Sequence, residues 1–200
     1  MLVQAAAIAE VAEHDVAAVE PLLDACEATL RGGRQVVVTA LGKNVPICEK
    51  FSGTLNSFGL AARFMHTNSA IHGDLGMLAQ GDLLIIVSKS GKTEESVALA
   101  RLVKQRPVET WALTCDGASS LAGLTQRVCE IGLDDEGDLW NLAPIGSSIV
   151  FLAVFNAIAV ELSARLGITR ADFLANHPGG EIGRIGRIAE LESVAEDVAD

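Results

Sequence analysis

The sequence contains no tyrosine, and aromatic residues make up only 4% of its 200 positions. It is also poor in positive charge, because 15 lysines and arginines stand against 26 aspartates and glutamates, for a net charge of −11. An acidic chain repels phosphate backbones, so we expect no nucleic-acid partner. Half of the residues are hydrophobic. Such a high apolar content without tyrosine suggests that part of the apolar surface meets another subunit.

Cysteine is scarce, and no two cysteines form a CxxC pair, which argues against a disulfide framework or a zinc site. The four are Cys26, Cys48, Cys115 and Cys129. We interpret them as small buried hydrophobes in a reducing cytosol, and we expect no metal. The N-terminus lacks the cationic start of a signal peptide. The longest apolar stretch, residues 149–160, is too short for a bilayer span, so we expect a soluble, cytoplasmic protein with no membrane partner.

Apolar periodicity alternates along the chain between helical and extended patterns. The predicted helices are 1–30 (with a fresh segment at Pro21), 45–58, 94–104, 119–124, 144–166 and 169–175. The predicted strands are 36–38, 61–66, 82–87, 108–114 and 127–133. Strands that alternate with helices imply right-handed crossovers, so we predict an α/β three-layer sandwich with a five-stranded parallel sheet. We expect one domain, in which a helical segment (1–34) precedes the α/β part (35–187) and an acidic tail (188–200) follows.

Ligands of such sheets bind beyond the carboxyl ends of the strands. There the segment Ser88-Lys89-Ser90-Gly91-Lys92-Thr93 follows the most strand-like run and opens a helix. Hydroxyls, a glycine and a helix N-terminus together attract phosphate, although an ordinary capped turn has the same residues. A nucleotide P-loop would need glycine where the chain has Ile86, so we exclude that motif.

The segment Gly42-Lys43-Asn44 follows the first predicted strand. Lys43 could pair with a phosphate or a sugar oxygen as a point charge, or it could be a solvated loop residue. No GxGxxG pattern occurs, so a dinucleotide is not expected. Ser147 and Ser148 open the long helix and could form either a second anion-facing N-terminus or an ordinary first turn.

Two histidines, His72 and His177, lie in glycine-bearing loops, whereas His14 and His66 have structural positions. Histidine changes charge near neutral pH and suits proton transfer, and flanking glycines let the backbone approach a ligand. A lone loop histidine is more often a polar surface residue. No ligand spacing supports metal binding by these side chains.

Taken together, these motifs resemble the sugar isomerase (SIS) domain family, and more narrowly the D-arabinose 5-phosphate isomerases. The matching segments are Gly42-Lys43, AIHGDLGM at 70–77, SKSGKTEES at 88–96, LAP at 142–144 and ADFLANHPGGEIGR at 171–184. HGDLGM and HPGGxxGR in this order are specific signals, whereas SxSGxT marks the wider SIS group. The resemblance implies a flavodoxin-like SIS fold that binds a phosphorylated sugar and assembles as a homodimer or homotetramer.

The resemblance further implies reversible interconversion of D-ribulose 5-phosphate and D-arabinose 5-phosphate through an enediol, and we expect no cofactor. By the motif match, Ser88, Ser90 and Thr93 would hold the phosphate. Lys43, His72, Glu95 and His177 would occupy catalytic positions, although the neighbouring Glu94 could replace Glu95. The remaining candidates for substrate or phosphate binding are Gly42, Asn44, Gly91, Ser147 and Ser148. In the family, the HPGG histidine reaches a site on a neighbouring subunit.

The chain departs from the family pattern at Ser69 and Lys92, where acids are common, and at Ile145 and Gly146, which interrupt a hydroxyl-rich run. Full-length relatives also carry a pair of CBS modules, which we expect this chain to lack. Two alternatives therefore stay open. One is a non-catalytic phosphosugar-binding sensor module, and the other is an isomerase of a different phosphosugar, such as a 6-phospho-hexulose.

Overall fold

The structure is a computed structural model that describes residues 1–186. The strands are β1 (Val36–Ala40), β2 (Ala62–His66), β3 (Leu83–Val87), β4 (Glu109–Thr114) and β5 (Arg127–Glu130). The α-helices are α1 (Leu2–His14), α2 (Val16–Arg31), α3 (Val45–Ser57), α4 (Thr67–Ala70), α5 (Glu94–Val103), α6 (Gly146–Arg165) and α7 (Arg170–Ala175). Short 3-10 turns span Gly42–Asn44 and Asp74–Met77.

The five strands form one parallel sheet in the order β2-β1-β3-β4-β5. This is the strand order of flavodoxin-like folds, and it confirms the predicted five-stranded parallel sheet. β1 and β3 are wholly buried and occupy the middle of the order. The loops that follow these two strands therefore meet at the sheet's carboxyl edge, where the strand order reverses.

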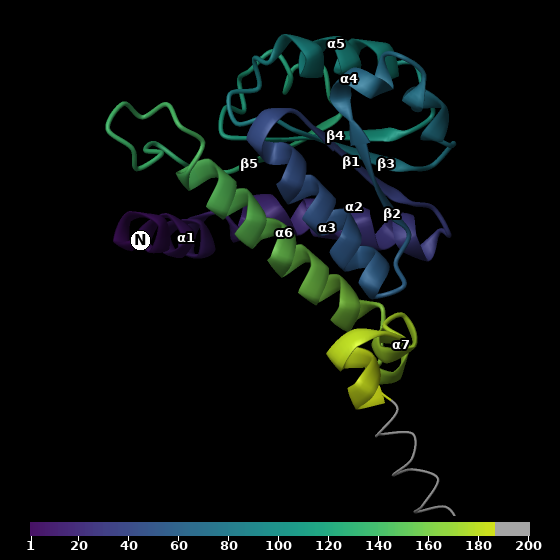
Figure 1. Cartoon of the computed structure of the whole chain (residues 1–200). Coiled ribbons are helices and arrows are strands. Elements are labelled where there is room, and N and C mark those ends of the chain that lie inside the picture. Colours follow the sequence, from purple (N-terminus) through teal and green to yellow (C-terminus); the bar gives the residue numbers. More distant parts are fainter. Residues whose placement is uncertain (187–200) are drawn as a thin grey trace, which may run out of the picture.

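Three layers build the domain, because each strand sends alternate side chains to opposite faces. Val36 and Val38 pack into the cluster that contains α2, α3 and α6. Val37 points the other way, into a second cluster with α5 and the segment around Leu121. Figure 1 shows α4 and α5 on one side of the sheet and α2, α3 and α6 on the other.

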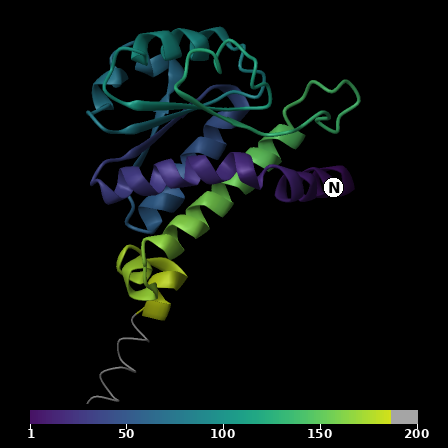
Figure 2. The same ribbon diagram turned by 180° about the vertical axis from the view of Figure 1, so that it is seen from behind.

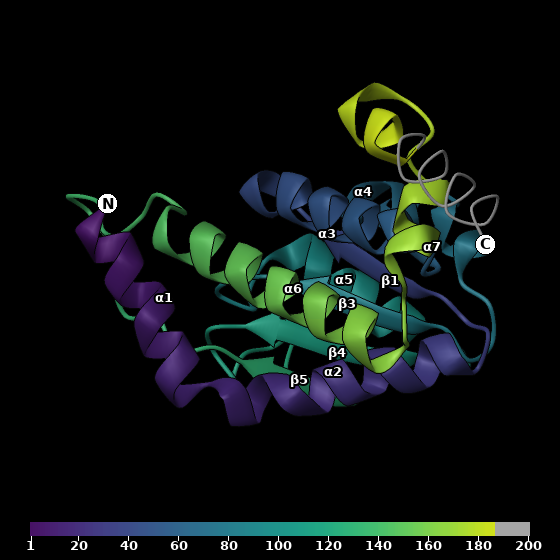
Figure 3. The ribbon, with the colours of Figure 1, turned by 90° about the horizontal axis from the view of Figure 1, so that it is seen from below.

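The long helix α6 is a core helix, as the sequence predicts. It runs across α2 and α3 (Figure 3), and the ring of its Phe155 stacks on Phe51 of α3 with centroids 4.2 Å apart. Within the described residues, it is the one helix long and apolar enough to cross a bilayer by length and composition alone. Nine of its residues are buried against the rest of the chain, which accounts for that composition.

Several local predictions were wrong. The N-terminal helix breaks at Asp15, whose carboxylate accepts a hydrogen bond from the Gly132 N–H (2.8 Å), whereas Pro21 lies inside α2. Residues 119–124 form turns instead of a helix, and the last strand ends at Glu130. The short helix α4 was not predicted. The proposed tail 188–200 lies outside the described residues, and the division into segments remains a prediction.

Candidate functional site

A pocket of about 210 Å³ opens at the carboxyl edge of the sheet. Three loops contribute to it: the one after β1, the one between β3 and α5, and the one before α6. Its lining consists of Leu41, Lys43, Asn44, Val87, Ser88, Lys89, Ser90, Thr93, Ser96 and Pro144. Residues that are 100 positions apart in the sequence therefore share one concave site, at the place where the strand order predicts a ligand.

One wall of the pocket is the hydroxyl-rich loop between β3 and α5. The Ser88 and Thr93 hydroxyl oxygens lie 3.1 Å apart, and the Lys92 N–H donates to the Ser90 hydroxyl (3.2 Å). Thr93 caps α5 without a side-chain hydrogen bond to the helix. The N–H groups of the first turn, together with the positive end of the helix dipole, therefore remain available to an anion.

Gly91 lets this loop close on itself. Its φ is +59°, and a Cβ at this position would lie 2.0 Å from the Ser119 hydroxyl oxygen. Its carbonyl accepts a hydrogen bond from the Leu121 N–H (3.0 Å). The turn segment that follows β4 thus packs against the loop between β3 and α5. Only glycine fits at position 91, where the two segments meet.

Two lysines of the loop have different surroundings. Lys89 lines the pocket, and its ammonium lies 3.2 Å from a carboxylate oxygen of Glu136. Lys92 is outside the lining, and its ammonium is held 2.9 Å from Asp116. The hydrogen bond from Lys92 keeps the pKa of the Asp116 carboxyl below its usual range. The sequence could not separate these two lysines, and the structure assigns Lys89 to the pocket.

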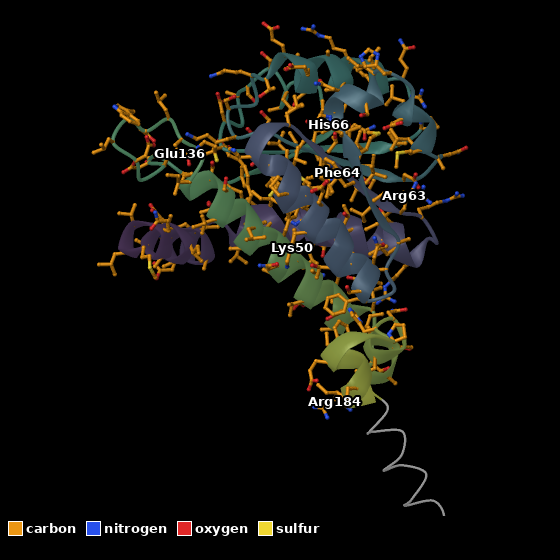
Figure 4. All side chains as sticks on the ribbon, viewed as in Figure 1. Lys50, Arg63, Phe64, His66, Glu136 and Arg184 are labelled. Atoms are coloured by element: carbon orange, nitrogen blue, oxygen red, sulfur yellow. The ribbon has the colours of Figure 1, made fainter. Side chains whose placement is uncertain are left out.

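Glu136 is a residue that the sequence interpretation missed. It belongs to an acidic stretch, yet its side chain is only 1% exposed and lies at the start of α6 (Figure 4). Its two carboxylate oxygens accept hydrogen bonds from the Ser147 hydroxyl (2.7 Å) and the Ser147 N–H (2.9 Å). The Glu136 carboxylate thus accepts a hydrogen bond from a backbone N–H group at the N-terminus of α6. Among the acids of 134–138, no sequence signal marks the buried one.

The predicted binding residues fall into three groups. Four of them, Asn44, Ser88, Ser90 and Thr93, line the pocket. Gly42 and Gly91 are neighbours of lining residues, and both have positive φ. Ser147 and Ser148 lie outside the lining, with the Ser147 hydroxyl on Glu136 and the Ser148 hydroxyl donating to the Pro144 carbonyl (2.5 Å).

Three of the four predicted catalytic residues do not line the pocket of this one chain. Glu95 and its neighbour Glu94 are exposed on the first turn of α5. His72 is exposed in the turn after α4. Only Lys43 lies in the lining.

His177 is held at the far end of α6. It follows α7, its Nδ1 is 2.7 Å from the Phe173 carbonyl oxygen, and its ring packs on the Phe173 ring. α6 has 20 residues, so it extends about 30 Å between the pocket-lining Pro144 and the segment that carries α7. Figure 1 shows α7 beyond the end of α6 that is remote from the sheet edge.

No candidate metal site was found in residues 1–186, because they contain no group of three or more His, Cys, Asp or Glu side chains that could hold an ion. The expectation of a site without metal or cofactor stays a prediction.

Comparison with known proteins identifies the domain family of the chain. The sequence model of the SIS domain matches residues 29–161. The chain is 35% identical over 165 residues to the arabinose 5-phosphate isomerase KdsD of Pseudomonas aeruginosa, covering 82% of this chain and 51% of that protein. It is 35% identical over 158 residues to KpsF of Escherichia coli, with coverages of 78% and 50%. It thus spans about half the length of the curated relatives it matches.

Among solved structures, a protein of Escherichia coli CFT073 in complex with A5P superposes with a TM-score of 0.82 at 35% identity. The superposition covers 88% of this chain and 92% of that one. The parallel sheet with helices on both faces is therefore shared with a protein of similar size whose structure contains A5P.

Proposed function

The chain belongs to the SIS domain family, and from this we propose that it is a sugar-phosphate aldose–ketose isomerase that interconverts D-ribulose 5-phosphate and D-arabinose 5-phosphate. The observation that carries the proposal is the meeting of the Ser88, Ser90 and Thr93 hydroxyls with the Lys43 side chain in one pocket. A hydroxyl-lined loop at a helix N-terminus suits a phosphate, and a nearby ammonium suits the oxygen of a carbonyl. The names of the relatives and the bound A5P of the similar structure support the choice of substrate.

The reaction needs only proton movements. In the ketose-to-aldose direction, a base removes a proton from C1, an enediol forms, and a proton returns to C2 while the hydroxyl hydrogens redistribute between the two oxygens. No external oxidant or reductant is required. Lys43 would stabilise the developing oxyanion, and Glu95 with a histidine would divide the proton transfers.

The histidine comes from a second copy of the chain in our proposal. His177 lies about a full helix length of α6 from the pocket of its own chain, so it could serve only the pocket of another subunit. We propose a homodimer or homotetramer in which the His177 segment of one subunit completes the site of its neighbour, with His72 as a further candidate.

Exposed apolar surface supports assembly. The side chains of Leu139, Trp140 and Leu142 are 92%, 74% and 80% exposed. They lie on a loop that extends from the same side of the molecule as α1 (Figure 2), and Gly137 of this loop approaches Val3. An apolar groove of about 460 Å³ runs nearby between α1, α2 and α6. Clustered exposed apolar side chains of this kind mark protein interfaces.

The direct test is incubation of the purified, folded protein with D-ribulose 5-phosphate, with arabinose 5-phosphate detected as product. A panel of other pentose and hexulose phosphates run in parallel would identify a different substrate. The proposal is contradicted if no phosphosugar is turned over by protein that is folded and assembled.

Mixed subunits test the shared site. His177→Ala and Lys43→Ala should each be inactive alone, because each removes a proposed catalytic group from every site. Mixing the two under conditions that allow subunit exchange should restore up to about a quarter of the wild-type activity in a dimer, since random pairing leaves one intact site in half of the dimers. No recovery despite demonstrated exchange would contradict supply of His177 by a neighbour.

A second candidate function is a non-catalytic phosphosugar sensor. It is favoured by the exposure of Glu95 and His72 outside the pocket of the single chain. A sensor would bind sugar phosphate tightly without exchanging solvent deuterium into it, whereas an isomerase would exchange the proton at the enediol carbon.

We also propose a cytoplasmic location. The four cysteines are all free, and three of them are buried, which fits a reducing compartment.

A further inference from the structure

Two unpaired polar atoms belong to residues that line the same pocket. Within residues 1–186, three buried side-chain atoms have no hydrogen-bond partner: Gln4 Oε1, Asn44 Oδ1 and Ser96 Oγ. Both residues line the pocket, although Asn44 comes from the turn after β1 and Ser96 from the first turn of α5. Native proteins satisfy nearly all buried polar groups, so two unpaired groups in residues that line one cavity indicate a missing ligand group.

We propose that Asn44 and Ser96 form the subsite that binds a hydroxyl of the sugar. This subsite is distinct from the proposed phosphate-binding loop of Ser88, Ser90 and Thr93. Asn44 Oδ1 can only accept a hydrogen bond. The dianionic phosphate group of a sugar phosphate also only accepts, so it cannot complete Asn44. A ligand hydroxyl can donate to Asn44 and accept from the Ser96 hydroxyl at the same time. The inference deepens the proposed function and rests on it.

The position of Ser96 fits this division of the pocket. It lies three residues after Thr93 on α5, on the same side of the helix, and its side chain is only 1% exposed. The hydroxyls of Ser88 and Thr93 already face each other at 3.1 Å. The Ser96 hydroxyl has no hydrogen-bond partner within the described part of the chain. It is therefore the hydroxyl on this side of the pocket for which a ligand would supply the partner.

The test compares Ser96→Ala with wild type by calorimetric titration of two probes, arabinose 5-phosphate and inorganic phosphate. We expect affinity for arabinose 5-phosphate to fall about tenfold, which corresponds to about 1.4 kcal/mol, and affinity for inorganic phosphate to stay within twofold. The melting temperature of the unliganded protein should not fall, because the hydroxyl that is removed has no partner there.

Ser52→Ala provides the matched control. Ser52 is also a buried helical serine, 5% exposed, but its hydroxyl donates to the Glu49 carbonyl (3.0 Å), and it is not among the residues that line the pocket. Its replacement should lower the melting temperature and leave both affinities unchanged.

A second variant keeps the inference falsifiable. Asn44→Ala should weaken arabinose 5-phosphate and spare inorganic phosphate. Combined with Ser96→Ala, it should cost less than the sum of the two single changes, because both contact one ligand hydroxyl. Unchanged binding of arabinose 5-phosphate in both variants, or an equal loss for both probes, would overturn the inference while the proposed function stands. If the wild-type protein binds no phosphosugar, both the proposed function and this inference are contradicted.

Discussion

The Lys89 ammonium lies 3.2 Å from the Glu136 carboxylate, so a cation of the candidate phosphate pocket is tied to the start of α6. Glu136 is 1% exposed and also accepts two hydrogen bonds from Ser147. One buried carboxylate thus connects the loop after β3 with the loop before α6. This contact links two of the loops that line the pocket.

Replacing Glu136 by glutamine should lower the free energy of unfolding by about 2 kcal/mol, since the amide keeps an acceptor for Ser147 but loses the charge that faces Lys89. We place the effect below that of a fully buried pair because the Lys89 side chain is 35% exposed. Urea unfolding measures it. Asp134→Asn, an exposed acid of the same loop, is the control and should change stability by less than about 0.5 kcal/mol. Equal effects of the two substitutions would show that the Lys89 contact contributes nothing.

Gly91 and Gly53 should respond in opposite directions to alanine. Gly91→Ala forces a left-handed φ on a non-glycine residue and drives a methyl group into Ser119, so we expect a loss of about 2–4 kcal/mol and of phosphate binding. Gly53 lies in α3 with open space around it, and alanine there should stabilise the protein by about 1 kcal/mol. Thermal unfolding of both variants is the measurement. A neutral Gly91→Ala would mean that the loop has room to rearrange.

The sheet could be predicted from the sequence because its signals are local. The continuous apolar run at 83–87 and the β-branched run from Val36 mark strands that are covered on both faces. Parallel pairing then follows from the intervening helices. The helix break at Asp15 could not be predicted, since it coincides with a hydrogen bond to Gly132, which is distant in sequence. Residues 119–124 resemble a helix in composition, but they are too few to form one alone and instead bond to the loop at Gly91.

The candidate site was predicted in part for the same reason. Ser88, Ser90 and Thr93 lie close together in one loop. Lys43 follows a neighbouring parallel strand, so its loop meets theirs at the carboxyl edge of the sheet. Glu136 and Ser96 have no such signal. Their importance comes from burial and from contacts, or missing contacts, that depend on how α5 and α6 dock. The roles of Glu95, His72 and His177 stay predictions, because the pocket of one chain does not contain them.

The cysteines should be unreactive at neutral pH in the folded protein. Burial raises the pKa of Cys115 and of Cys129 to about 12 from an ordinary value of 9.0, and it raises the pKa of Cys26 and Cys48 as well. At pH 8 a thiol-exchange reagent should therefore label native protein far more slowly than urea-unfolded protein, with the half-buried Cys115 reacting first. Rapid labelling of any fully buried cysteine would contradict the packing described above.

The same shifts predict a loss of stability in alkali. These thiols stay protonated in the folded state, whereas in the unfolded chain they ionise near pH 9.0. Their contribution to stability is therefore complete below pH 9.0 and declines as the pH rises from there toward about 12. Urea midpoints at pH 8 and pH 10 should differ more for wild type than for a Cys115→Ala variant. Identical shifts in the two proteins would assign the alkaline loss to other groups.

Lys89 and Lys92 offer a test of which cation serves the phosphate. Both substitutions Lys89→Gln and Lys92→Gln remove one positive charge from the same loop, so any long-range effect on an anionic ligand should be nearly equal. Lys89 lines the pocket, however, while Lys92 is paired with Asp116 and is 67% exposed. We expect Lys89→Gln to weaken binding of inorganic phosphate by about 10-fold or more and Lys92→Gln by less than about twofold. Thermal unfolding establishes that both variants are folded. Equal losses would mean that only the summed charge of the loop attracts the ligand, and that the Lys89 ammonium remains on Glu136 when phosphate binds.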